Sequence, residues 1–214
     1  MCCLEKSGNI FTLTLTGEDD EHRLSPTLIE SIHIALKQVR TNAKPGSVLI
    51  TTAQGKFFSN GFDLEYAASA GSSTGSDNRF GGIFGGFKFV IAELLSLPMP
   101  TIAAVSGHAA AAGFFLALSH DYSKIPSPRV RRDVLLRSMK IREDKAVEMG
   151  IVDFAFDTVE ETKEAALKLA VKLGSNKWNG EVYADIRMNS FPEICKLLGF
   201  VANFKSVVPF KSKL

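Results

Sequence analysis

The chain has 214 residues, of which 45% are hydrophobic and 22% are charged, a composition typical of a globular protein with one substantial core. Its formal net charge of +2, from 25 basic and 23 acidic residues, argues against a nucleic-acid-binding surface. The three cysteines form neither a CxxC pair nor an even disulfide framework, so we expect a reducing or redox-neutral compartment and no structural zinc.

The N-terminal segment predicts a strand followed by a helix. The start, "MCCLEKSGN", carries Glu5 and Lys6 where a signal peptide needs an apolar core, so no secretion signal is expected. Residues 9–16, "NIFTLTLT", alternate apolar and polar side chains, which predicts a strand. Ser25 and Pro26 then supply a helix N-cap and a proline at the first helical position. The apolar stripe of this helix comprises Leu28, Ile29, Ile32, Leu36 and Val39.

The middle of the chain predicts two further strands. "SVLITT", residues 47–52, is continuously apolar, as in a buried strand of a parallel βαβ unit. Residues 69–86 are rich in glycine and serine and predict a mobile loop beside the site, after which a helix resumes. "TIAAV", residues 101–105, predicts a third strand, and Gly107 then turns the chain into an alanine-rich helix that ends near His120. The serine, glycine and histidine in this stretch argue against a membrane span.

Beyond residue 128 the pattern is helical almost throughout. Gly150 is a C′ glycine for the helix before it, and residues 151–156, "IVDFAF", predict a short strand. Two more helices are expected over residues 159–174 and 179–198, the second kinked or split at Pro192.

This pattern divides the chain into an α/β core over residues 1–128 and a helical C-terminal part over residues 129–211. The basic run "RVRRD", residues 129–133, favours a solvated helix face over a phosphate site. The last three residues, Ser212, Lys213 and Leu214, form the peroxisomal targeting tripeptide, which an import receptor reads. We therefore expect a peroxisomal location.

Twice the chain runs from a strand through a tight turn into a helix, at residues 47–64 and 101–116. The first turn of a helix has main-chain N–H groups without intrahelical acceptors. Two such corners on adjacent parallel strands can aim two donors at one point, which is an oxyanion hole built without side chains. The simpler alternative is that both corners are only connections between strands and helices.

The corners also resemble a known family. "GKFFSNGFDL", residues 55–64, resembles the F-S-x-G-x-D-L signature of the crotonase, or enoyl-CoA hydratase/isomerase, superfamily. "PMPTIAAVSGHAAAAGFFLALSHD", residues 98–121, is similar to its second signature, and "KAVEMGIVD", residues 145–153, to a later turn. Plant peroxisomal Δ3,Δ2-enoyl-CoA isomerases of this superfamily begin and end much like this chain. The resemblance implies a crotonase-like βαβ spiral core with a helical C-terminal part.

Carried over residue by residue, the resemblance makes the N–H groups of Phe62 and Ala112 the two oxyanion donors. It implies an acyl-CoA thioester as substrate, with CoA as part of the substrate rather than a cofactor, no metal, and a homotrimer. The substrate-binding residues that it implies are Ser59, Asn60, Gly61, Phe62, Asp63 and Gly113. Phe115 stands where hydratases of the family carry a glutamate, which favours isomerisation over hydration.

One segment of the family pattern is missing. After "SHDY", residues 119–122, the family continues with a strand, a loop carrying the catalytic glutamate, and a helix, but here "SKIPSPRVRRD" follows at once. Residues 123–127 are too few for a parallel crossover, which needs a dozen or more. We therefore expect an incomplete core, whether the gap belongs to the protein or to splicing.

The general base is not identifiable from the sequence. Asp63 and Glu65 follow the first corner, but helix capping and solvation are the favoured roles for them. His108 and His120 are expected to be structural. The prediction is a Δ3,Δ2-enoyl-CoA isomerase of unsaturated fatty acid β-oxidation, impaired by the missing glutamate; the alternative is a non-catalytic acyl-CoA-binding or partner subunit.

Overall fold

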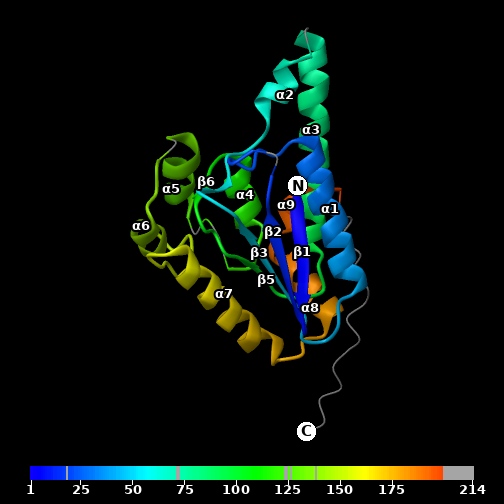
Figure 1. Cartoon of the computed structure of the whole chain (residues 1–214), viewed down its shortest axis with the longest axis vertical. Helices are drawn as coiled ribbons and strands as arrows, with labels where there is room; N and C mark the ends of the chain where they lie inside the picture. Colours follow the sequence, from blue (N-terminus) through cyan, green and yellow to red (C-terminus); the bar gives the residue numbers. More distant parts are fainter. Residues whose placement is uncertain (18, 71–72, 123–124, 126, 138, 200–214) are drawn as a thin grey trace.

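The computed structural model of the chain describes residues 1–17, 19–70, 73–122, 125, 127–137 and 139–199. A four-stranded mixed sheet forms its centre, with strand order β1-β2-β3-β5 (Figure 1). The strands β1 and β2 are antiparallel, and β2, β3 and β5 are mutually parallel. A second, two-stranded parallel sheet pairs β4 with β6. The bounds are β1 Cys2–Ser7, β2 Ile10–Leu15, β3 Val48–Ala53, β4 Phe57–Ser59, β5 Thr101–Ala103 and β6 His108–Ala109.

Helices cover both faces of the main sheet. The helices α1 (Pro26–Thr41) and α3 (Ser73–Leu95) pack on one face, and α7 (Val159–Gly174) packs on the other (Figure 1). Each face of the sheet carries its own hydrophobic core, and strand β3 contributes to both because its side chains alternate between the two faces. Its Leu49 and Ala53 face α1, whereas Val48 and Ile50 join the alanines of α7.

The first predicted helix is confirmed in its start and its buried face. The Ser25 hydroxyl caps α1 by accepting a hydrogen bond from the Leu28 N–H at 3.2 Å, and Pro26 occupies the first turn. All members of the predicted stripe are buried. The strands predicted over 9–16, 47–52 and 101–105 are also present as β2, β3 and β5.

The loop predicted over residues 69–86 is wrong from Ser73 onward, because α3 begins there. Buried side chains recur every three or four residues along α3, and this stripe against α1 outweighs a cost of about 1 kcal/mol for each helical glycine. Its buried members are Ile83, Phe87, Val90, Leu94 and Leu95. The N-terminal half of α3 projects beyond the body together with α2 (Leu64–Ala68) (Figure 1).

Three other local predictions differ from the structure. Gly107 leads into β6 before α4 (Ala112–Leu118) begins, since β6 pairs with β4. Residues 151–156 form a loop with one isolated bridge residue rather than a strand. Strand β1 was not predicted; a two-residue turn, with Gly8 at a φ of 59°, folds it back on β2.

The C-terminal part is helical as predicted. Gly150 has a φ of 66° just after α6, and the second predicted helix is split into α8 and α9, with Pro192 as the first residue of α9. Its elements besides α7 are α5 Pro128–Arg131, a π-helix Arg132–Leu136, α6 Glu143–Glu148, α8 Gly180–Ser190 and α9 Pro192–Leu197. The three arginines of residues 129–133 lie on α5 and the π-helix, and all three are exposed.

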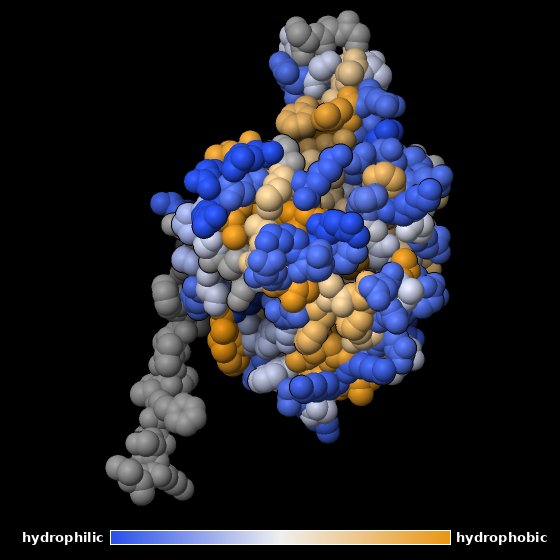
Figure 2. All heavy atoms as spheres, turned by 90° about the vertical axis from the view of Figure 1, so that its left-hand side faces the viewer, coloured by the Kyte–Doolittle hydropathy of each residue, from blue (hydrophilic) through white to orange (hydrophobic). Residues whose placement is uncertain are grey.

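Figure 2 faces the side that carries α5, α6 and α7, where hydrophilic residues cover much of the surface. Apolar side chains gather at the neck below the projecting end of the molecule. In the part of the chain that the structure describes, strand β5 is the last strand of the main sheet, and no helix is long and apolar enough to cross a membrane. The targeting tripeptide lies outside the described residues, and the division at residue 128 stays a prediction.

Candidate active site

The first corner connects β4 to α2 through a glycine turn. Gly61 has a φ of 91°, which glycine adopts without strain. The Leu24 N–H donates to the Gly61 carbonyl at 2.7 Å, and the Asp63 N–H donates to the Leu24 carbonyl at 3.4 Å. These two bonds flank Phe62 on the Leu24 side, so the Phe62 N–H points away from Leu24.

The second corner connects β6 to α4 through a turn of alanines. The Gly113 N–H donates to the Ala110 carbonyl at 2.8 Å and closes a four-residue turn. Ala111 has φ 46° and ψ −122°, the second position of a type II′ turn, which glycine normally occupies. The N–H of Ala112 belongs to the central peptide of this turn and takes no part in the closing bond.

The two corners touch each other. The strands β4 and β6 pair in parallel, and the Ala110 N–H donates to the Ser59 carbonyl at 3.0 Å. A Cβ on Gly61 would lie 2.9 Å from the Ala111 Cβ and 3.3 Å from the Ala112 nitrogen, and a Cβ on Gly113 would overlap the Ser59 carbonyl. Glycine is therefore required at both positions for the main chains to come this close.

Within the described residues, neither the Phe62 N–H nor the Ala112 N–H donates a hydrogen bond. Phe62 is half-buried and Ala112 is buried. A main-chain N–H without a protein acceptor is uncommon in a folded protein and is available to bind a ligand or water. An oxyanion hole needs two such donors close together, and this role of the Phe62 and Ala112 N–H groups stays a prediction.

Phenylalanines hold the first corner in place. The Phe62 ring packs edge-to-face against Phe80, Phe84 and Phe87 of α3, with centroid distances of 5.7, 6.3 and 5.3 Å. Edge-to-face pairs are worth about 0.5–1.5 kcal/mol each beyond the apolar area that they bury. The side chain of Phe62 therefore anchors the corner on α3 and leaves its main-chain N–H to the site.

The other predicted substrate-binding residues differ in their access to a ligand. Ser59 is fully buried, and its hydroxyl donates to the His22 carbonyl at 2.8 Å and accepts from the Gly61 N–H at 3.3 Å, so it supports the corner. Asn60 is exposed and donates to Glu21 at 2.7 Å. Asp63 caps α2 by accepting from the Tyr66 N–H at 2.9 Å, as expected. Contacts of these residues with CoA stay predictions.

Sequence reasoning missed His22, which supports the first corner. The residue is 3% exposed, and its Nδ1 lies 2.9 Å from the Phe57 carbonyl oxygen. Its φ of 48° is strained for a residue other than glycine. Nothing in the pattern of residues 17–23 marks it, because its partners are main-chain atoms about 35 residues away.

The four candidate bases have structural surroundings. Asp63 caps α2, and Glu65 is exposed and pairs with Arg23 at 3.5 Å. His108 is exposed on β6, with its ring 5.3 Å from that of Phe57. His120 is buried between the Leu116 carbonyl at 3.0 Å and the Thr51 hydroxyl at 2.9 Å, and this burial lowers its pKa to about 4.

Phe115 is 45% exposed and lies in α4 one turn beyond Ala112. An apolar ring at this position offers no hydrogen bond to a water molecule. Among the described residues, no group of three or more acidic, histidine or cysteine side chains is arranged to hold a metal ion. The groups at the two corners that lack acceptors among the described residues are thus main-chain N–H donors.

Comparisons with known proteins place this geometry in context. The sequence model of the enoyl-CoA hydratase/isomerase family matches residues 5–127. The chain is 48% identical to enoyl-CoA delta isomerase 2, peroxisomal, of Arabidopsis thaliana, over 93% of this chain and 95% of the relative. It is 42% identical to enoyl-CoA delta isomerase 1, peroxisomal, of the same plant, over 91% of each.

Two solved structures share the fold. An enoyl-CoA hydratase/isomerase family protein from Pseudomonas syringae superposes with a TM-score of 0.77 at 23% identity, over 92% of this chain and 93% of that one. A probable enoyl-CoA hydratase from Mycobacterium tuberculosis gives a TM-score of 0.78 at 19% identity, over 92% and 91%. The crotonase-like fold class predicted from the signatures is confirmed.

The alignments also contain a gap in this chain. The alignment with enoyl-CoA delta isomerase 2 spans 230 positions but takes up 93% of 214 residues, about 199, so about 31 positions face no residue here. The alignment with enoyl-CoA delta isomerase 1 spans 226 positions and 91%, about 195 residues, which again leaves about 31. The chain is therefore internally shorter than both relatives.

Proposed function

The chain belongs to the enoyl-CoA hydratase/isomerase family, and from this membership we propose that it is a Δ3,Δ2-enoyl-CoA isomerase of unsaturated fatty acid β-oxidation. The substrate is an acyl-CoA thioester whose carbon–carbon double bond moves from C3 to C2. One observation carries the proposal: the N–H groups of Phe62 and Ala112, on contacting corners, have no acceptor among the described residues.

In this reaction a base removes a proton from C2, and the thioester becomes an enolate. The two N–H groups donate to the enolate oxygen, and because they are already in place they stabilise this charge with little reorganisation. The proton returns at C4, and the thioester carbonyl reforms. Phe115 disfavours the rival hydration, because its ring cannot hold and activate a water molecule.

We further propose that the rate of this chain is reduced because the segment with the catalytic glutamate is missing after Tyr122. Three observations support this: about 31 alignment positions without a counterpart, a family match that ends at residue 127, and a described sheet that ends at β5. Loss of a general base costs about 10²–10⁴ in rate. Both corners precede that segment in the sequence, so all of their residues are present in this chain.

The test is an isomerase assay with 3-hexenoyl-CoA, run beside enoyl-CoA delta isomerase 2 as the reference. We expect measurable turnover that is slower by about 10²–10⁴. Turnover equal to that of the relative would refute the missing-base argument. Absence of turnover together with absence of acyl-CoA binding would refute the isomerase proposal.

A non-catalytic acyl-CoA-binding subunit is the second candidate, and the same gap favours it. Binding of acyl-CoA without turnover, with increased activity of an active relative upon mixing, would support this candidate. Two relatives are named peroxisomal, and we propose the same location for this chain. The import receptor, the homotrimer and the absence of a cofactor stay predictions.

A further inference from the structure

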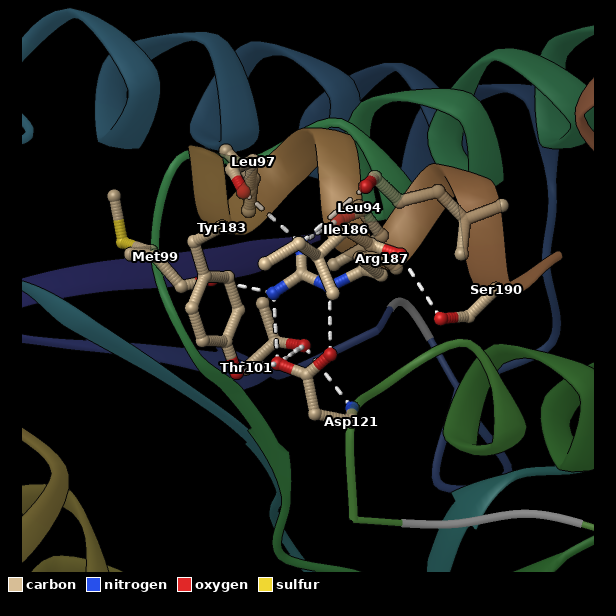
Figure 3. A network of polar contacts seen from close by, with 10 residues as sticks. Leu94, Leu97, Met99, Thr101, Asp121, Tyr183, Ile186, Arg187 and Ser190 are labelled. Atoms are coloured by element: carbon tan, nitrogen blue, oxygen red, sulfur yellow. Dashed lines mark hydrogen bonds and ion pairs between the residues drawn. The ribbon is translucent and has the colours of Figure 1, made fainter. Parts of the chain in front are cut away.

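Arg187 is a buried arginine whose hydrogen-bonding groups are all engaged. It projects from α8, and its side chain is 4% exposed (Figure 3). The Nε donates to Asp121 Oδ1 at 2.6 Å and Nη2 donates to Asp121 Oδ2 at 2.7 Å, a bidentate ion pair. The remaining N–H groups donate to main-chain carbonyls. These acceptors are Leu94, Leu95, Leu97 and Met99, at 2.6 to 3.4 Å.

Asp121 ties this arginine to the sheet. Its Oδ2 accepts from the Thr101 N–H at 2.8 Å and from the Tyr183 hydroxyl at 3.1 Å, and its own N–H donates to the Thr101 carbonyl at 3.1 Å. Figure 3 shows the carboxylate between the guanidinium, Thr101 and the Tyr183 ring. Asp121 is thus fixed to the first residue of β5.

The two ends of this network belong to the two elements that frame the oxyanion hole. The carbonyls of Leu94 and Leu95 end α3, whose phenylalanines hold Phe62. Asp121 comes three residues after the end of α4, whose first residue is Ala112. Arg187 therefore bonds the C-terminal end of one element to that of the other.

We propose that Arg187 is a positioning residue of the oxyanion hole: by joining α3 to the end of α4 it fixes the distance between the Phe62 and Ala112 N–H groups. This inference rests on the proposed function, because it assigns Arg187 to the same two donors. A displacement of about 1 Å in such a site can lower the reaction rate about 100-fold. The two corners already touch through the β4–β6 pairing, and Arg187 adds to this contact by fixing the helices that carry Ala112 and hold Phe62.

The shape of the arginine is essential to the arrangement. A planar guanidinium serves two carboxylate oxygens and several carbonyls at once, whereas a lysine ammonium has three donors on one atom. Arg187→Lys keeps the charge and breaks the simultaneous contacts. We expect Arg187→Lys to weaken the connection between the end of α3 and Asp121 without leaving the Asp121 carboxylate unpaired.

The test measures binding of acetoacetyl-CoA, a 3-oxo thioester whose enolate has its own ultraviolet absorption, and of free CoA as a probe that lacks the carbonyl. We expect Arg187→Lys to weaken enolate binding about 10- to 100-fold and to leave free CoA binding unchanged. Arg40→Lys is the matched control, because Arg40 donates to the Ser96 and Glu93 carbonyls at the same end of α3 but projects from α1.

Unchanged enolate binding in Arg187→Lys, or an equal loss in Arg40→Lys, would overturn the inference. If the unmutated chain binds neither acetoacetyl-CoA nor free CoA, the proposed function fails, and the inference fails with it. If the unmutated chain and Arg187→Lys show the same enolate absorption, only the inference is refuted. Tyr183→Phe, which removes one hydroxyl bond to Asp121 and keeps the ring, repeats the test where Arg187→Lys does not fold. A smaller but selective loss supports the inference, and equal binding refutes it.

Discussion

Beside the middle of α3 and at the start of α4 the protein brings main-chain N–H groups together among glycines and alanines, and near the C-terminal ends of both helices it buries an arginine with an aspartate. The first region has two donors without acceptors among the described residues, whereas the second satisfies every donor of Arg187. The first is ready for a ligand, and the second is closed. In our proposal, the spacing of donors that need a ligand depends on a region whose own polar groups are satisfied.

The largest effect is expected when the closed region loses its anion. Asp121→Ala leaves the buried Arg187 guanidinium without its carboxylate, since the two side chains are 15% and 4% exposed. Breaking a buried pair by removing one partner costs about 3–5 kcal/mol. Urea unfolding measures the change in the free energy of unfolding. A loss below about 1 kcal/mol, the value of a surface pair, would show that the pair contributes little.

The open region is expected to show a large effect on binding. Ala112→Pro deletes the second N–H at the first position of α4, which suits proline, although the ring disfavours the φ of 46° at Ala111, so urea unfolding is measured beside binding. Loss of one oxyanion donor lowers the rate of an enzyme about 10²- to 10³-fold, and we expect a similar loss of affinity for the acetoacetyl-CoA enolate. Ala112→Gly keeps the N–H and serves as the control. Equal enolate affinity in both variants would exclude Ala112 as a donor.

A pH titration separates the regions further, because His120 lies beside the closed one. Burial lowers its pKa from 6.5 to about 4, while Asp121 and Arg187 act in opposite directions. Above pH 6.5 the ring is neutral in both folded and unfolded chains. As the pH falls from 6.5 to 4, only the unfolded chain binds the proton, so the free energy of unfolding drops by about 3 kcal/mol. In His120→Gln, urea unfolding should show no such fall in the free energy of unfolding between pH 6.5 and 4. An unchanged fall would mean that another group binds the proton.

The two regions also differ in how much of each the sequence predicts. The open region follows from local signals, because Gly61, the alanines and Gly113 stand where the sequence predicts a turn from a strand into a helix. The closed region joins residues 66 positions apart, and nothing near Arg187 in "YADIRMNS" distinguishes it from a solvated arginine on a helix. Tertiary contacts between such distant residues produce no periodic pattern in the sequence around either residue.

The loop predicted for the glycine-rich segment before Phe87 is wrong for the same physical cause. Composition favoured a loop, but the stripe of α3 buries apolar side chains against α1, and the Phe62 ring adds contacts with Phe80 and Phe84. The strand register that brings β4 beside β6 was likewise beyond local pattern, because each strand is only two or three residues long. Tertiary packing therefore decided these elements.

The smallest expected effect concerns strain in the open region. Ala111 has φ 46°, where an L-residue costs about 1–3 kcal/mol, and glycine there costs about 0.5–1 kcal/mol in chain entropy. Ala111→Gly should therefore raise the free energy of unfolding by about 1 kcal/mol in urea unfolding. Ala110→Gly is the control, because Ala110 has no positive φ and should lose about 0.5–1 kcal/mol. Equal losses in both variants would mean that Ala111 carries no strain, and the direction of the Ala112 N–H would then need another explanation than this turn.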